Sequence, residues 1–354
     1  MPDSSVDERR SRADAFDVRT VHPHVRFGTA SDRYAGWIGQ IYPDHLSQEI
    51  SSRKRKLGGQ TFEERNVPIA SVKHYFEHFE TLELDFTFYR PLRDANGEPT
   101  NNYFVLEKYA DHAPNDATFL VKAPQTYFAR TLRRSSGGDV RYIDNPDFLD
   151  VEAYRTQFHE PVREVLGDRL AGLLFQQEYQ RVADSPSPKQ NVETLDAFFQ
   201  QIPGDAQAHL ELRSEHLLTD VYFDWLAKRG LGFIFSHWTW LPPIRKQWKR
   251  CGGRFTAADG NVVARLLTPR DVKYADAYAA AYPFDERAPE IADTQQAREM
   301  VLDATALAFQ AAQQNALLNC IANNRAWGNA PDLARTIAHR ILDEEERRAE
   351  RAEG

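Results

Sequence analysis

Short apolar runs alternate with amphipathic segments along most of the chain. Eight of these runs have the length and composition of strands that are buried on both faces. They are residues 25–30, 81–86, 118–123, 170–176, 208–213, 231–237, 262–267 and 317–324. Strands that alternate with helices pair in parallel, and eight such units close into a barrel more readily than they spread into an open sheet. The pattern therefore predicts an α/β fold with a single (β/α)₈ TIM-type barrel.

Helical periodicity separates the apolar runs. The last helix is the clearest example, because Leu333, Ile337 and Ile341 recur every four residues after Asn329 as a candidate cap and Pro331 in the first turn. Further helices are expected over residues 71–79, 151–166, 191–202, 217–226, 244–248 and 294–315. This spacing places one helix after most of the strands.

Three long insertions interrupt this pattern, at residues 47–66, 130–146 and 183–190. The first contains the basic run 53–56, and all three lie in connections that follow strand C-termini. In a barrel these connections form the face that carries function. The glycine-rich fingerprints of dinucleotide and P-loop sites do not occur, so neither kind of site is predicted.

The two ends of the sequence are charged and lack a regular apolar pattern. We expect residues 1–24 to form a disordered charged arm, residues 25–342 to form the barrel, and residues 343–354 to form a charged helical extension that frays into solvent.

Composition and charge narrow the class of protein. The 354 residues are 42% hydrophobic and 12% aromatic, which is enough for a large core, and the net charge of −8 argues against a general nucleic-acid binder. The two cysteines, Cys251 and Cys320, match no metal spacing and suit a reducing cytoplasm. No run approaches the ~18 apolar residues of a membrane helix, and residues 1–19 do not read as a secretory signal.

Charged residues occupy alternate positions within several of the predicted strands. Glu83, Lys122, Glu211, Arg213 and Arg265 fall on the strand face opposite the large apolar residues. A charge inside a barrel is costly unless it is paired, so these residues are expected to form a compensated cluster. The cluster is either an anion- or hydroxyl-binding pocket with one carboxylate free for proton transfer, or a structural ion-pair layer.

These positions define the candidate site. The predicted catalytic residues are Glu83, Glu211 and Lys122, and the predicted substrate-binding residues are Tyr89, Gln176, Arg213, His237, Arg265 and Asn323. Two tryptophans, Trp238 and Trp240, follow His237. Their indole rings could stack on sugars or bases, or could simply fill the top of the barrel. No metal site and no cofactor are predicted, although a single divalent metal held partly by substrate is still allowed.

Short segments spread over most of the chain carry a family resemblance. They occur in family order at residues 28–29, 36–37, 42–43, 75–79, 82–83, 87–90, 121–124, 173–176, 211–213 and 323–331. As a set the sequence resembles the DUF72 (YecE-like) family, whose members are TIM barrels of unestablished biochemical function. The resemblance implies the barrel and a mouth formed around the candidate residues. The sequence departs from the family pattern at residues 29–32, 126–128 and 177–178, which implies a different ligand.

Three functions are compatible with the sequence. The first is an enzyme, a hydrolase or a lyase, that acts on a phosphorylated or sugar-containing substrate, with Lys122, Arg213 and Arg265 binding an anion and Glu83 as general acid or base. A standard retaining glycosidase is disfavoured because the seventh strand offers Arg265 in place of an acid. The second is a nucleic-acid-binding or nucleic-acid-processing barrel, which the negative charge disfavours. The third is a non-catalytic barrel that binds a ligand. The sequence leaves the oligomeric state open and predicts no membrane association.

Overall fold

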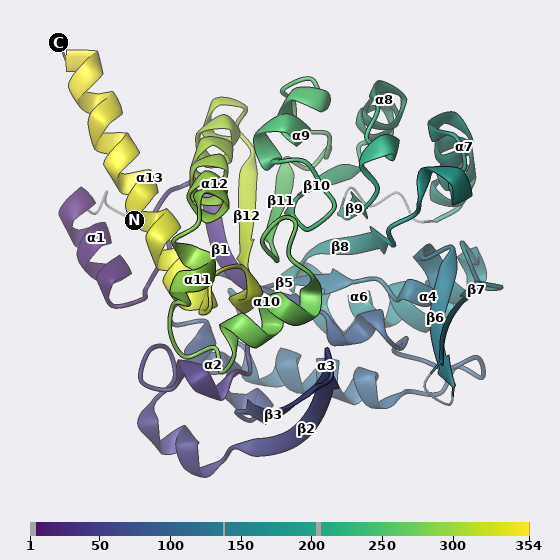
Figure 1. The fold of residues 1–354 in the computed structure, drawn as a ribbon, viewed down its shortest axis with the longest axis horizontal. Coiled ribbons are helices and arrows are strands. Elements are labelled where there is room, and N and C mark those ends of the chain that lie inside the picture. Colours follow the sequence, from purple (N-terminus) through teal and green to yellow (C-terminus); the bar gives the residue numbers. More distant parts are fainter. Residues whose placement is uncertain (1–4, 137–138, 203–206, 354) are drawn as a thin grey trace.

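Eight parallel strands close into a barrel surrounded by helices (Figure 1). The computed structural model describes residues 5–136, 139–202 and 207–353. The barrel strands are β1 (Val25–Ala30), β4 (Thr81–Leu84), β5 (Thr118–Lys122), β8 (Leu170–Gln177), β9 (Ala208–Leu212), β10 (Gly232–His237), β11 (Asn261–Leu266) and β12 (Leu317–Ala322). Each strand pairs in parallel with the next one along the chain, and β12 pairs with β1 to close the barrel. All eight predicted strands and the predicted (β/α)₈ barrel are therefore confirmed.

The imidazole ring of His209 fills the barrel interior near the N-terminal ends of the strands. His209 on β9 is fully buried and lies opposite two glycines, Gly172 on β8 and Gly232 on β10. A Cβ atom at residue 232 would lie 2.0 Å from Nδ1 of His209, and one at residue 172 would lie 2.9 Å from its Cδ2. The two glycines are needed here because neighbouring side chains would collide with the ring.

The helices form the outer layer of the barrel. They are α2 (Val72–Tyr75), α3 (Asn101–His112), α4 (Gln125–Phe128), α5 (Val151–Tyr154), α6 (Glu160–Leu166), α7 (Pro188–Phe199), α8 (Asp220–Arg229), α9 (Ile244–Arg250), α10 (Tyr274–Ala281), α11 (Pro289–Ala292), α12 (Gln295–Gln313) and α13 (Ala330–Glu353). At α13 the predicted cap is confirmed, since Oδ1 of Asn329 accepts from the N–H of Asp332 at 2.8 Å. Helix α3 was not predicted from the sequence, although Thr100 caps its first turn.

Two of the three insertions fold as antiparallel hairpins instead of irregular loops. Strands β2 (Ser51–Leu57) and β3 (Gln60–Asn66) form the first hairpin, and β6 (Thr131–Ser136) and β7 (Asp139–Asp144) form the second. The first hairpin could not be recognised from the sequence, because its strands consist mostly of charged and polar residues. The basic residues of β2 face the acidic residues of β3, so the pair has no apolar stripe apart from the buried Phe62.

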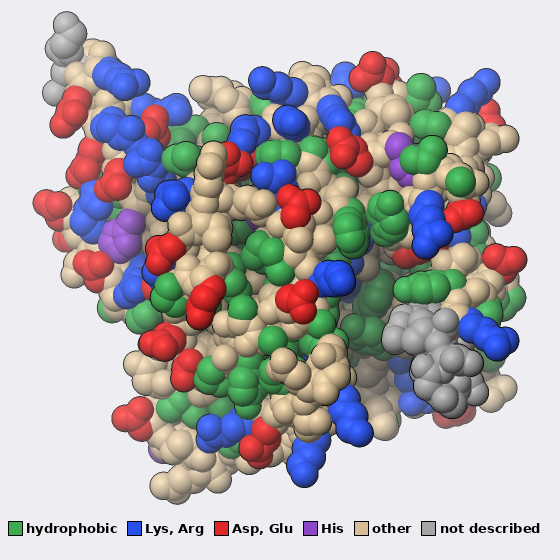
Figure 2. Space-filling model, viewed as in Figure 1, with side chains coloured by type: hydrophobic (Ala, Val, Ile, Leu, Met, Phe, Trp, Pro, Cys, Tyr) green, Lys and Arg blue, Asp and Glu red, His purple; other side chains and the backbone are tan. Residues whose placement is uncertain are grey.

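The N-terminal arm was expected to be disordered, and this expectation is wrong for the residues that the structure describes. Helix α1 (Val6–Asp14) begins with a capping box and packs against α13. The charged C-terminal tail was expected to be a helical extension, and α13 does continue to Glu353 (Figure 1). Oppositely charged side chains crowd this corner of the molecule (Figure 2).

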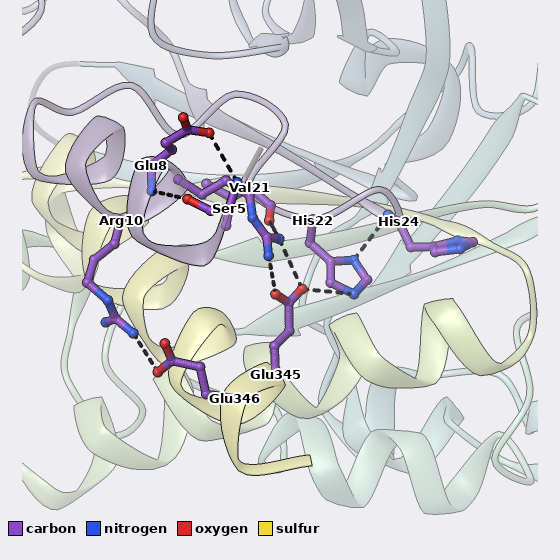
Figure 3. A network of polar contacts seen from close by, with 9 residues as sticks. Ser5, Glu8, Arg10, Val21, His22, His24, Glu345 and Glu346 are labelled. Carbon is purple, nitrogen blue, oxygen red and sulfur yellow. Dashed lines mark hydrogen bonds and ion pairs between the residues drawn. The ribbon is translucent and has the colours of Figure 1, made fainter. Parts of the chain in front are cut away.

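Complementary charges explain why these two helices meet. Arg9 on α1 forms an ion pair of 2.7 Å with Glu345 on α13 and donates at 2.6 Å to the carbonyl of Val21. Arg10 forms a further ion pair of 2.9 Å with Glu346 (Figure 3). The same charges that suggested a solvated arm therefore pair across two distant segments of the chain.

Candidate functional site

Strand alternation brings the five predicted charged residues together at the mouth of the barrel. In the strand register, Glu211 on β9 lies beside Gln176 on β8, and Ser236 on β10 lies beside Arg265 on β11. Side chains of paired residues on parallel strands point to the same side of a sheet. The predicted cluster of Glu83, Lys122, Gln176, Glu211, Arg213 and Arg265 is thereby assembled inside the barrel.

Arg265 bridges the two glutamates of the cluster. Its Nε and Nη2 donate to the two oxygens of Glu83 at 2.8 and 2.6 Å, and its Nη1 donates to Oε2 of Glu211. Ser236 Oγ donates to the other oxygen of Glu211 at 2.8 Å. Burial alone would raise the pKa of Glu211, but the nearby Arg213, Arg265 and Lys122 lower it to about 2.

One of the two alternatives drawn from the sequence leaves one of these carboxylates free for proton transfer, whereas in the structure Arg265 holds both. Both side chains are buried, and both form ion pairs with Arg265, whose Nε, Nη1 and Nη2 all donate to them. Glu83 and Glu211 therefore serve as counter-ions that offset the desolvation cost of the buried Arg265 guanidinium.

Lys122 is the cluster member whose charge is least compensated. Its Nζ donates to Oε1 of Gln176 at 2.8 Å and lies 3.8 Å from the centre of the Phe88 ring. Burial, together with the positive charges of Arg265 and Arg213, lowers the pKa of Lys122 from 10.5 to about 7. Near neutral pH the amine can therefore both accept and donate a proton.

Arg213 lies above the paired glutamates and is only loosely held. Its Nε is 3.5 Å from Oε1 of Glu211, and its guanidinium lies 4.0 Å from the centre of the Trp238 ring. Within the described part of the chain, this guanidinium forms no hydrogen bond that meets normal geometry. The role of Trp238 is thus to support the arginine plane, and the donors of Arg213 remain available.

A cavity of about 650 Å³ lies beside the cluster, on the side of β1, β4 and β12. Hairpin β2–β3 and helix α10 contribute to its walls, and Glu83 is shared between the cavity and the ion cluster. The residues on which its chemistry depends are Asp32, Arg55, Asp85, Tyr89, Tyr274, Tyr278, Asn323 and Arg325. Beside α10 the surface is visibly hollowed, toward the β6–β7 hairpin (Figure 2).

The remaining predicted residues divide into two groups. Tyr89 and Asn323 line the cavity, and Tyr89 is 71% exposed at its edge. His237 is not brought into the site, because it shares the strand face of Phe235, which packs outward against Trp248. Burial and the charge of Arg270 lower the pKa of His237 to about 3, as expected for a neutral core histidine.

Arg325, which lies in the turn after β12, was not predicted from the sequence. Its guanidinium lies 4.5 Å from the centre of the Tyr274 ring, and it forms no ion pair with any residue that the structure describes. Its position immediately after the family-like Asn323-Asn324 pair was the available signal. The role of Asp85 was also undervalued, although it sits two residues beyond Glu83 and accepts from Oγ of Ser31 at 2.8 Å.

A buried carboxyl lies under the cavity. Asp32 accepts a hydrogen bond of 2.7 Å from the hydroxyl of Tyr109, and burial raises the pKa of Asp32 to about 6. Across the described residues, no group of three or more histidine, cysteine or acidic side chains is arranged to hold a metal ion. No described helix is long and apolar enough to cross a membrane.

Fold and site together define a parallel (β/α)₈ barrel with a buried ion cluster at its mouth. The chain belongs to the DUF72 family, because the family model described as "Protein of unknown function DUF72" matches residues 26–353. The resemblance noted in the sequence is therefore confirmed. None of the curated proteins matches this chain significantly.

Solved structures of the family have the same fold. A DUF72 family protein from Thermotoga maritima is 17% identical, with a TM-score of 0.52 over 90% of this chain and 99% of its own. One from Enterococcus faecalis is 13% identical, with a TM-score of 0.50 over 91% of this chain and 98% of its own. At such identities the likeness establishes the barrel and does not extend to a reaction.

Proposed function

We propose that the protein is an enzyme that acts on a small anionic substrate, phosphorylated or sugar-containing, bound at the barrel mouth. One observation carries the proposal. Lys122, Arg213 and Arg325 are cations with donors not used by the protein, while the two buried glutamates are already occupied by Arg265. Desolvated cations with free donors favour phosphate or carboxylate groups, and arginine can hold them with two parallel bonds.

The same three residues lie close enough to influence one another. The charge of Arg213 lowers the pKa of Lys122, and the charge of Arg325 lowers that of Arg213. Like charges held together in a poorly hydrated site are unfavourable, and a bound anion would relieve this repulsion.

Lys122 is the group that we assign to proton transfer. A buried amine whose pKa is about 7 takes part readily in acid–base chemistry at neutral pH. Asp85 is the accompanying carboxylate, since its recorded contact is with Ser31 and no ion pair joins it to a described residue. The proposal replaces Glu83 and Glu211 with Lys122 and Asp85 as the acid–base pair, and it needs no cofactor.

Nucleic-acid binding has weaker support. The basic run of β2 is one of three basic clusters that motivate it, yet Arg53 and Arg55 are both ion-paired to Glu64 on β3, each at 2.7 Å. Only the exposed Lys54 and Lys56 of this run remain for a phosphate backbone. In the cluster on α9, Arg245 and Arg250 are also ion-paired, to Glu299 and Glu215. A binding surface that depended on counterion release would need more unpaired cations than this.

Binding of inorganic phosphate, followed by a screen of phosphate monoesters for turnover, tests the proposal. Arg213→Gln and Arg325→Gln should each weaken phosphate binding by about tenfold or more, because each removes a charge-assisted contact. Lys246→Gln on the exposed face of α9 is the matched control. Turnover of a screened ester should be lost in Lys122→Met. Unchanged phosphate affinity in both arginine variants would refute the proposed site.

A further inference from the structure

The cavity beside the ion cluster is rich in polar residues, and several of them are hydrogen-bonded within the protein. Asp32 accepts from Tyr109 at 2.7 Å, and Asp85 accepts from Ser31 at 2.8 Å. The second oxygen of Asp32 is sealed from solvent. Among these two carboxylates, Asp85 is therefore the one that keeps an acceptor for a ligand.

Three amides of the cavity hold its loops in place. Nδ2 of Asn102 donates to two backbone carbonyls at 3.2 and 2.8 Å. Oδ1 of Asn323 accepts from a backbone N–H at 3.0 Å, and Oδ1 of Asn324 accepts from the N–H of Ala330 at 2.7 Å. One end of each amide is thus used to fix a loop.

Aromatic rings and guanidinium planes form the flat part of the cavity lining, in which Tyr278 is buried. On α10 the rings of Tyr274 and Tyr278 stack at 6.5 Å and 27°. Their hydroxyls are used to hold the hairpin, since Tyr274 accepts from Nη2 of Arg55 at 3.1 Å and Tyr278 donates to Glu64 at 3.1 Å. The rings are therefore fixed in position.

Guanidinium planes and an exposed ring complete this flat lining. Arg55 lies 5.0 Å from the centre of the Tyr278 ring, and Arg325 lies 4.5 Å from that of Tyr274. Tyr89, which follows β4 along the chain, exposes 71% of its surface at the edge of the cavity. Aromatic rings and guanidinium planes both stack on nucleobases, largely without regard to the sequence of bases.

We propose that this cavity binds the base of a mononucleotide, whose phosphate lies on the cations at the barrel mouth. The inference rests on the proposed function and names its substrate class. The two halves adjoin, because Arg325 and Glu83 both line the cavity and Glu83 is bonded to Arg265 of the ion cluster. The volume of about 650 Å³ falls within the range of small-molecule sites and leaves room for base and ribose.

Calorimetric titration with four probes tests this assignment, namely inorganic phosphate, ribose 5-phosphate, adenosine and adenosine 5′-monophosphate. The mononucleotide should bind roughly tenfold tighter than ribose 5-phosphate, because stacking on even one ring is worth about that much. Adenosine should bind weakly. Equal affinity for the mononucleotide and ribose 5-phosphate would overturn the inference and leave the proposed function intact.

Variants of Tyr89 locate the base. Tyr89→Leu should remove most of the preference for the mononucleotide over ribose 5-phosphate, whereas Tyr89→Phe, which keeps the ring, should retain it. Because this side chain is exposed, neither substitution should affect folding. Retention of the full preference in both Tyr89→Leu and Tyr274→Leu would overturn the assignment of the cavity.

The two proposals fail in different ways. If neither phosphate nor ribose 5-phosphate binds, the proposed function fails at its anion site. Adenosine, which has no phosphate, still tests the cavity in that case, since its binding should be lost in Tyr89→Leu and kept in Tyr89→Phe. Absence of adenosine binding together with normal phosphate binding would reject the base subsite alone.

Discussion

Replacing Lys122 with methionine should change how the stability of the protein depends on pH. The pKa of this amine falls from 10.5 to about 7 on folding, mainly because of burial. Below pH 7 the amine is charged in both the folded and the unfolded state, so the folded state bears the full cost of burying a charge. Above pH 7 the folded state releases a proton that the unfolded state keeps, and the cost declines as the pH rises.

The size of this effect follows from the same pKa. Between pH 7 and pH 9 the wild type should gain about 2 kcal/mol from this one group, because the slope rises from about half of 1.36 kcal/mol per pH unit at the pKa to nearly the full value above it. Lys122→Met has no amine to titrate and should lose this gain. The free energy of unfolding by urea, measured for both proteins at pH 6, 7, 8 and 9, gives the difference directly, because all other groups titrate alike in the two.

Lys108→Met on α3 is the matched control, since this lysine is exposed. Its pH dependence of stability should parallel that of the wild type. If Lys122→Met also parallels the wild type between pH 7 and 9, then Lys122 stays protonated in the folded state. A Lys122 amine that stays protonated could not act as a base near neutral pH, so its proposed role in proton transfer would be refuted.

Three further substitutions test the packing and pairing that hold the site. Arg265→Met leaves its two glutamate partners buried without a counter-ion, so urea unfolding at pH 7 should show a loss of about 3–5 kcal/mol; a smaller loss at pH 7 than at pH 4 would contradict this. Gly232→Ala forces a Cβ onto the ring of His209 and should cost about 1–3 kcal/mol in thermal unfolding, a loss relieved in the double variant with His209→Ala. A double-mutant cycle between Arg9 and Glu345 should give a coupling of at most about 1 kcal/mol that shrinks with added salt, and a coupling that does not change with salt would exclude an ion pair.

The barrel could be predicted because its strands have an unusually plain pattern. Each of the eight runs is buried on both faces, so apolar residues are continuous and only a few polar residues stand out. Those exceptions, such as Lys122 and Arg265, then had to point into the barrel. The cluster geometry follows from strand alternation alone, which is why it was predicted without a structure.

The cavity could not be predicted in this way. Part of its wall is a hairpin whose strands pair through opposite charges. Another part is α10, whose sequence lacks a clear helical period of apolar residues. Arg325 owes its role to the turn after β12 and to the ring of Tyr274, a residue about fifty positions away. Roles that depend on such long-range contacts leave no local pattern. For the same reason, the sequence could not show that Arg265 takes up both glutamates.

The pairing of α1 with α13 has a consequence for how the chain reaches its native state during synthesis. Arg9 and Glu345 are 336 positions apart, so the first helix waits for its partner until almost the whole domain has been made. The same holds for β1, whose pairing with β12 closes the barrel. Closure at the ribosome is therefore a late event. Until it occurs, β1 and β12 each present an unpaired edge, and a chaperone that shields such edges would protect the nascent domain.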